Sequence, residues 1–119
     1  MRVLVCGGRD FTNVTLMNQV IDQLPVGTIV RDGGARGADT LAHKAAMARE
    51  LVTETFYANW EKFGKSAGVR RNQEMIDDGT VDQVIAFPGG RGTVDMVQRA
   101  QAADIPVWYP TIFSPNLPL

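Results

Sequence analysis

Three short loops combine glycines with an arginine, and together they hold eight of the 12 glycines in the chain. They span residues 6–10, 33–39 and 88–93, and each follows an apolar run and precedes a helical pattern. Glycine lets the backbone approach a ligand closely, and a helix that starts after such a loop presents free N–H groups to an anion. Three such loops predict one site for a phosphate-bearing molecule.

The third loop carries the most specific pattern. Its candidate ligand contacts are Pro88, Gly89, Gly90, Arg91, Gly92 and Thr93. The glycines leave bare backbone for a ligand, and Thr93 lies where the next helical pattern opens, so its hydroxyl and the neighbouring N–H groups can hold a phosphate. A structural turn needs only one glycine, whereas three glycines and an arginine favour binding.

The second loop offers Gly34, Arg36, Gly37 and Asp39 as candidate contacts. Its glycines permit an anion-binding turn at a helix start. Asp39 either stabilises the helix dipole or accepts hydrogen bonds from ribose hydroxyls or a base edge. His43 lies four residues further on the same helix face, so we expect a structural His43–Asp39 pair. With one histidine and one cysteine in the chain, the sequence predicts no metal site.

The first loop has two interpretations. Either Gly8 and Arg9 face a phosphate or ribose, or the loop is a plain strand-to-helix turn with a solvated ion pair. It is not the dinucleotide fingerprint, which requires glycine where Arg9 and Thr12 stand.

Further candidates lie in residues 59–66, which we expect to form a polar loop, and in the helical pattern after them. Trp60 either stacks on a base or covers the sheet edge, and Lys65 approaches an anion or stays solvated. Arg71 and Asn72 are candidate contacts, since one arginine of the Arg70–Arg71 pair can face the crevice.

The composition is that of an ordinary folded protein. The chain has 12 Lys and Arg against 13 Asp and Glu, a net charge of −1. This balance argues against a protein built mainly to bind nucleic acid, although a local basic patch stays open. The single cysteine fits a reducing compartment, and no apolar stretch reaches membrane-spanning length. We therefore expect a cytoplasmic protein without a membrane or cofactor partner.

Strand and helix patterns alternate along the chain. Strands are predicted at residues 3–6, 28–31, 53–58, 81–87 and 105–109, and helices at residues 12–24, 38–51, 67–78 (with Ser66 as N-cap) and 93–103. This alternation predicts an α/β, three-layer Rossmann-like fold, with a five-stranded parallel sheet flanked by helices on both faces. We expect one domain over residues 1–119, with an irregular proline-containing tail at 110–119. Ligands of such sheets bind beyond the carboxyl ends of the strands, where all three loops lie.

The three loops together with Arg71-Asn72 resemble the SLOG superfamily, and within it the small YspA-like, cpYpsA-related group. The resemblance covers about residues 2–109. It implies a Rossmann-like fold that binds nucleotides or nucleotide-derived ligands, and it implies self-association, because superfamily members often form homodimers.

Two better-understood branches share parts of the pattern. Residues 34–43 look like a stretch of DprA, a single-stranded DNA-binding protein, and residues 88–93 look like the motif of the lonely-guy phosphoribohydrolases. In the hydrolases a glutamate follows three residues after the threonine, where this chain has Met96, and a helix arginine matches Arg71. Asp95 stands one position earlier, rotated by about 100° around the helix.

Three functions therefore compete. The first is a binding module for a nucleotide-derived ligand, as sensor or sequestering protein. The second is an N-glycosidase of nucleoside monophosphates with Asp95 and Arg71 as catalytic residues. The third is DprA-like binding of single-stranded DNA through an arginine patch formed by Arg9, Arg36, Arg70, Arg71 and Arg91.

Overall fold

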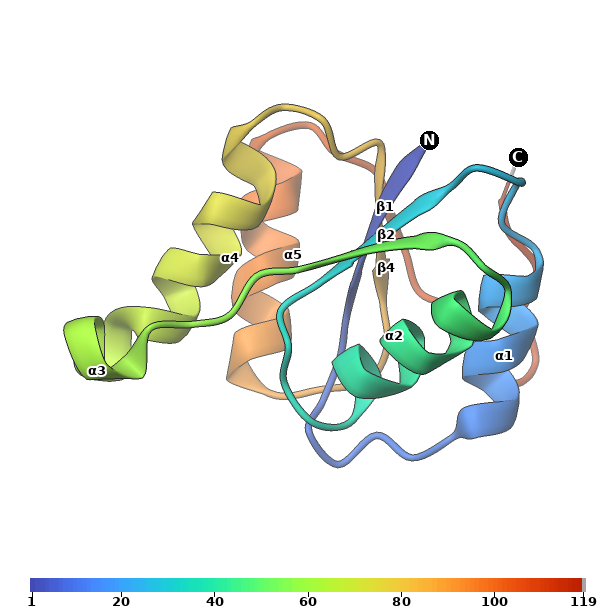
Figure 1. The fold of residues 1–119 in the computed structure, drawn as a ribbon, viewed down its shortest axis with the longest axis horizontal. Coiled ribbons are helices and arrows are strands. Elements are labelled where there is room, and N and C mark those ends of the chain that lie inside the picture. Colours follow the sequence, from blue (N-terminus) through green and yellow to red (C-terminus); the bar gives the residue numbers. More distant parts are fainter. Residues whose placement is uncertain (119) are drawn as a thin grey trace.

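Five parallel strands form the sheet, and helices cover both of its faces, as the sequence pattern predicts (Figure 1). The computed structural model describes residues 1–118. The strands are β1 (Arg2–Cys6), β2 (Ile29–Asp32), β3 (Val52–Thr55), β4 (Gln83–Ala86) and β5 (Val107–Trp108). The helices are α1 (Val14–Asp22), α2 (Ala38–Ala48), α3 (Trp60–Phe63), α4 (Ala67–Asp77) and α5 (Arg91–Ala102). No helix within residues 1–118 has the length and apolar character needed to cross a bilayer.

The strand order is β3-β2-β1-β4-β5. The chain builds outward from β1 through β2 to β3 and then returns to the other side of β1 to form β4. The strand order therefore reverses between β1 and β4. This is the place where a parallel sheet of this kind opens a crevice for a ligand.

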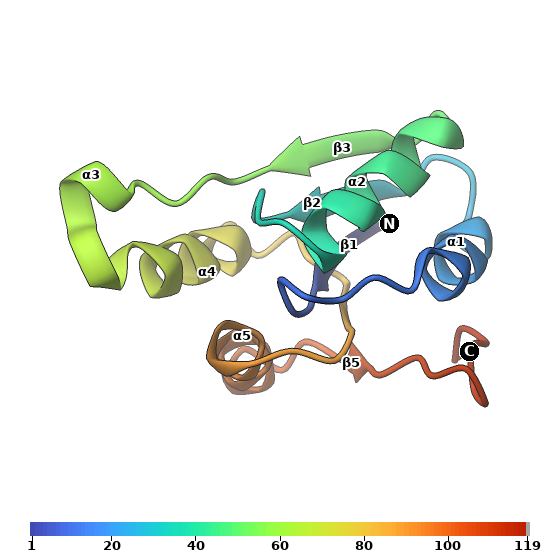
Figure 2. The same cartoon turned by 90° about the horizontal axis from the view of Figure 1, so that it is seen from below.

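The central strand explains why both faces are covered. Val3 and Val5 of β1 are buried in a core formed with α1 and α2, whereas Leu4 and Cys6 are buried in a second core formed with α4 and α5. Successive strand side chains point to opposite faces, so a run of apolar residues supplies both cores. The layers separate clearly in Figure 2, with α2 and α5 on opposite sides of the sheet.

The segment of residues 59–66 is not the loop that its polar composition predicts. It forms the short helix α3 and a turn of 3₁₀-helix (Gly64–Ser66). The Asn59 side chain accepts a hydrogen bond from the Lys62 N–H at 3.0 Å and caps α3. Ser66 takes the N-cap position of α4 but makes no capping bond; its hydroxyl donates to the Phe63 carbonyl oxygen and accepts from Arg70 Nε. The helix α3 lies away from the sheet, beside the start of α4 (Figures 1 and 2).

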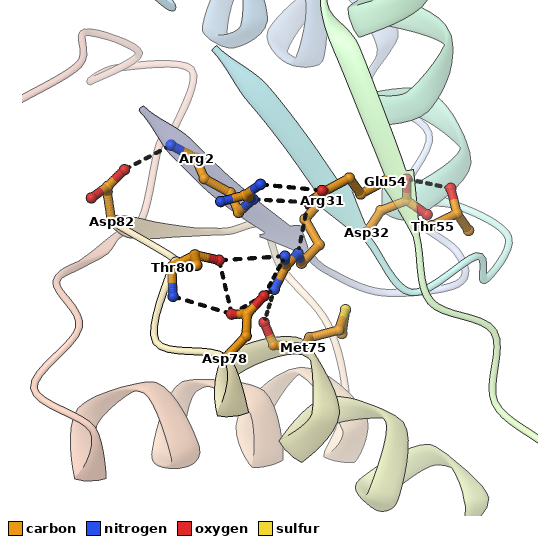
Figure 3. Close-up of polar contacts among 9 residues, drawn as sticks. All are labelled: Arg2, Arg31, Asp32, Glu54, Thr55, Met75, Asp78, Thr80 and Asp82. Carbon is orange, nitrogen blue, oxygen red and sulfur yellow. Dashed lines mark hydrogen bonds and ion pairs between the residues drawn. The ribbon is translucent and has the colours of Figure 1, made fainter.

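A buried arginine anchors α4 to the sheet, and nothing in the sequence pattern indicates it. Arg31 of β2 is 2% exposed. Its guanidinium donates to Glu54 of β3 at 3.0 Å, and to Asp78 at 2.9 Å and the Met75 carbonyl oxygen at 2.6 Å near the end of α4 (Figure 3). These charge-assisted bonds offset the cost of burying the charge. They fix α4, the helix that carries Arg71.

Candidate ligand-binding site

A cavity of about 410 Å³ opens at the carboxyl ends of β1 and β4. All three glycine loops reach it: Gly8 and Arg9 from the first, Ala35 and Asp39 from the second, and residues 90–93 from the third. α4 and α5 form its sides, with Arg71, Asn72 and Lys65 among the polar lining residues. The structure thus brings the three loops to one cavity at the point where the strand order reverses.

The third loop presents unoccupied N–H groups to this cavity. α5 begins at Arg91 with Gly90 as its N-cap, and no side chain caps it. The backbone N–H groups of residues 91–93 donate to no acceptor among residues 1–118. A Cβ atom added at Gly90 or Gly92 would meet nothing within 4 Å. This helix start therefore offers both free donors and the positive end of the helix dipole to an anion.

Gly89 has a different, structural role. A Cβ atom there would lie 2.6 Å from the Gly8 backbone nitrogen and would also meet the Thr93 hydroxyl. The Gly8 N–H donates to the Pro88 carbonyl oxygen at 2.8 Å. Gly89 thus lets the first and third loops pack against each other, and it lines a separate groove on the other side of the loop together with Pro88.

The second loop uses its N–H groups internally. The Gly34 N–H donates to the Asp32 carboxylate at 2.7 Å, and the N–H groups of Gly33 and Ala35 donate to Asp39 Oδ2 at 3.0 and 3.2 Å. These donors are therefore not available to a phosphate. Gly34 and Arg36 line a neighbouring cavity, while Gly37 packs against the backbone of Gly8 and Arg9.

Asp39 is the one carboxylate among the residues that line the 410 Å³ cavity. It is 6% exposed. Burial raises its pKa to about 6, against the opposing hydrogen bond from the Ala35 N–H. Both hydrogen bonds reach Oδ2, and Oδ1 accepts none from residues 1–118. Asp39 thus closes the loop with one carboxylate oxygen, and its other oxygen has no hydrogen-bond partner among residues 1–118.

The expected His43–Asp39 pair is wrong. His43 Nδ1 lies 3.6 Å from Asp32 Oδ2 instead. The Asp39 carboxylate instead accepts the N–H groups of Gly33 and Ala35. Asp32 ends β2 directly before the glycines, and this position was the sequence feature that could have indicated Asp32 as the partner of His43.

Of the two adjacent arginines, Arg71 faces the cavity. Its Nη1 donates to the Gly33 carbonyl oxygen and its Nε donates to Asn72 Oδ1 at 3.2 Å. Burial lowers the pKa of Arg71, and the nearby Asp39 opposes this effect. Arg70 turns the other way, to the Ser66 hydroxyl and the Phe63 ring.

Asn72 connects the two sides of the cavity. Its amide donates to the Gly92 carbonyl oxygen at 3.2 Å and to Asp95 Oδ2 at 3.0 Å. Asp95 also accepts from Arg99 Nε at 2.8 Å. Burial raises the pKa of Asp95, but these hydrogen bonds outweigh it and leave the pKa below its ordinary value. Asp95 is thus an ionised partner of Asn72 and Arg99, and it does not line the cavity.

Apolar side chains that the sequence analysis did not select form part of the cavity wall. Met96 is 1% exposed and lines the cavity together with Val69 and Met75. Trp60, which the sequence left between base stacking and covering the sheet edge, lines it as well. Cys6 is another wall residue, and burial raises the pKa of its thiol to about 12, so it stays protonated. Within residues 1–118, no three His, Cys, Asp or Glu side chains gather as a metal site requires.

Comparison with known proteins identifies the family. The model of the YspA, cpYpsA-related SLOG family matches residues 1–63. A Gene 61 protein of Mycobacterium phage D29 is 43% identical over 117 residues, covering 89% of this chain and 93% of the phage protein. The chain belongs to this SLOG family. The resemblance inferred from the loops is thereby confirmed.

A solved structure supports the fold. The DNA processing protein A (DprA) of Streptococcus pneumoniae superposes with a TM-score of 0.76 at 21% sequence identity. The match covers 96% of this SLOG-family chain and 52% of the DprA chain, so this chain spans about half the length of that protein. The comparison confirms the Rossmann-like architecture.

Proposed function

We propose that this SLOG-family chain binds a nucleotide or nucleotide-derived ligand in the cavity between β1 and β4 without cleaving it. The observation that carries the proposal is the start of α5, where unoccupied N–H groups face a cavity with Arg9, Arg71 and Arg91 in its wall. Helix starts of this kind bind phosphate, and arginine supplies bidentate hydrogen bonds to it.

The remaining lining residues suit the other parts of a nucleotide. Trp60, Val69 and Met96 offer apolar and aromatic surface for a base. Asp39 Oδ1, which has no partner among residues 1–118, suits a ribose hydroxyl. Phosphate, sugar and base thus each find a matching surface within 410 Å³.

Binding is favoured over N-glycosidic cleavage because the wall lacks a second acidic group. Met96 occupies the wall position where the hydrolase pattern has its glutamate, and Asp95 is engaged by Asn72 and Arg99. A general acid or base must reach its proton within hydrogen-bond distance. DNA binding is less favoured because Arg70, one member of the arginine patch, is held on the Phe63 ring.

Isothermal titration calorimetry with a panel of nucleoside mono- and diphosphates tests the proposal. Arg71→Met should weaken phosphate-dependent binding about 10- to 100-fold, the loss of about 1.5–3 kcal/mol for hydrogen bonds to a charged group. Arg70→Met is the matched control, since its guanidinium lies outside the cavity, and it should leave affinity unchanged. The bound nucleotide should be recovered intact. Absence of binding across the panel would refute the proposal, and release of free base would favour the hydrolase.

A further inference from the structure

A second cavity adjoins the first and shares one wall with it. This outer cavity has a volume of about 380 Å³. Four residues line both cavities: Arg9, Ala35, Trp60 and Arg71. The two spaces therefore meet at a boundary that carries two guanidinium groups and one aromatic ring.

The outer cavity has its own surface for a ring system. Tyr57, on the extended segment that joins β3 to α3 (Figure 2), is 75% exposed. Its ring lies against the Gly34 backbone, because a Cβ atom there would meet the ring carbons at 2.6 Å. One side of the Tyr57 ring is thus supported by the loop, and the ring remains accessible for stacking. Trp60, 51% exposed, borders the same space.

Positive charge also extends into the outer cavity. Its charged lining residues are Arg9, Arg36 and Arg71, and none of its lining residues is acidic. Arg36 pairs with Asp10 at 3.2 Å, but both side chains are largely exposed, so this pair competes weakly with a ligand anion. An anion at the boundary would meet Arg9 and Arg71 from either cavity.

From this arrangement we propose that the ligand is a two-unit nucleotide, with two ring-bearing units joined through a phosphate bridge. The bridge lies at Arg9 and Arg71, one unit occupies the inner cavity and the second stacks at Tyr57 in the outer cavity. The inference rests on the proposed function and adds the ligand class. A mononucleotide fills only the inner cavity and leaves the outer aromatic and cationic surface unused.

The test compares three ligands that carry the same base, namely the base that binds best as a mononucleotide. They are the nucleoside monophosphate, the diphosphate, and the symmetrical dinucleoside diphosphate, all titrated by calorimetry at fixed salt. The dinucleoside diphosphate should bind at least tenfold more tightly than the diphosphate, since stacking of one further ring on an aromatic side chain contributes about that much.

Variants separate the outer cavity from the inner one. Tyr57→Ala should weaken the dinucleoside diphosphate about tenfold and leave the monophosphate unchanged. Tyr109→Ala is the matched control, because Tyr109 is an exposed tyrosine that lines neither cavity. If the dinucleoside diphosphate binds no better than the diphosphate, the two-unit ligand is refuted while the proposed function stands. If no nucleotide binds, both are refuted.

Single-stranded DNA also carries ring-bearing units joined through phosphate groups, so the test includes a 20-nucleotide single strand as a further ligand. The two-unit proposal predicts that its affinity does not exceed that of the dinucleoside diphosphate. Much tighter binding of the strand, with a steep fall in affinity as salt increases, would overturn the proposal in favour of a strand-binding surface.

Discussion

The loop between β2 and α2 and the loop between β4 and α5 share the same sequence features. Each leaves the carboxyl end of a strand, contains glycines and an arginine, and starts a helix at a glycine N-cap, Gly37 or Gly90. In the first, Asp32 and Asp39 accept the N–H groups of residues 33–35. In the second, the N–H groups of residues 91–93 have no acceptor among residues 1–118.

The difference shows what glycine content alone does not reveal. A glycine-rich loop offers its N–H groups to an anion only if the protein's own carboxylates have not already accepted them. The glycines also differ in purpose. Gly37 has φ +79° and is closely surrounded by backbone, whereas Gly90 and Gly92 border open space. We call the β2–α2 loop the closed loop, because its N–H groups are paired with the protein's own carboxylates. We call the β4–α5 loop the open loop, and it is the phosphate site of the proposed function.

The largest effect should come from filling the closed loop. Gly37→Ala places a Cβ atom 2.6 Å from the Arg9 carbonyl carbon at positive φ. We expect a loss of about 3–5 kcal/mol in the free energy of unfolding, from strain and overpacking together. Gly79→Ala is the matched control, with φ +70° but nothing within 4 Å, and should cost about 1–2 kcal/mol. Equal losses in urea denaturation would show that the Gly37 contact is unimportant.

The buried carboxylate of the closed loop should make stability depend on pH. The pKa of Asp39 is raised from 3.8 to about 6. Between these values the folded chain holds a proton that the unfolded chain has released, so this group's contribution to the free energy of unfolding falls as the pH rises. Relative to Asp39→Asn, the wild type should lose about 2.4 kcal/mol between pH 4 and pH 7, since each pKa unit is worth about 1.4 kcal/mol and most of the titration lies within this range.

Urea denaturation of both proteins at the two pH values measures this loss. Asp95→Asn provides a control of opposite sign, because the pKa of Asp95 is lowered. Relative to that variant, the wild type should gain stability as the pH rises from the folded-state pKa of Asp95 to its unfolded value of 3.8. This window lies below pH 4, so the control is also measured at a lower pH. A pH-independent difference between wild type and Asp39→Asn would mean that Asp39 is not desolvated as the loop geometry implies.

The fold was largely predictable because alternation of apolar runs and helical patterns fixes a parallel sheet. The ends of the strands were less predictable than the fold. β3 ends at Thr55 rather than at residue 58, and β5 spans Val107–Trp108 rather than residues 105–109. In both cases β-branched or aromatic side chains continue the pattern beyond the last paired residue. Hydrophobic patterning reports burial, whereas strand ends depend on whether a neighbouring strand is there to pair with.

The location of the candidate site on the sheet was predictable, but the directions in which its side chains point were not. The loops and Arg71 could be placed at one edge of the sheet because strand ends meet there. Whether Asp39 faces a ligand or the loop depends on a competition for N–H groups that no spacing rule expresses. Arg31 is the extreme case, since a charged residue inside a strand becomes fully buried only because Glu54 and Asp78 arrive from distant segments.

A smaller effect should isolate one N–H group of the open loop. Arg91 is the first residue of α5, the helix position that tolerates proline best. Arg91→Ala removes the guanidinium and keeps the backbone donor, whereas Arg91→Pro removes both. Phosphate-dependent affinity should fall a further 5- to 10-fold in the proline variant, about 1 kcal/mol for one hydrogen bond, with the melting temperature unchanged. Equal affinities of the two variants would contradict an N–H contact from Arg91.

The smallest effect concerns the exposed ion pair of the closed loop. Arg36 donates to Asp10 at 3.2 Å, but the two side chains are 74% and 95% exposed, so water screens the pair. Asp10→Asn should therefore change the free energy of unfolding by less than about 0.5 kcal/mol. Urea denaturation compares this variant with Asp39→Ala. Asp39→Ala leaves the N–H groups of Gly33 and Ala35 unpaired and should cost about 2–3 kcal/mol in the free energy of unfolding. Similar losses in the two variants would mean that the exposed pair, rather than the buried carboxylate, holds the loop closed.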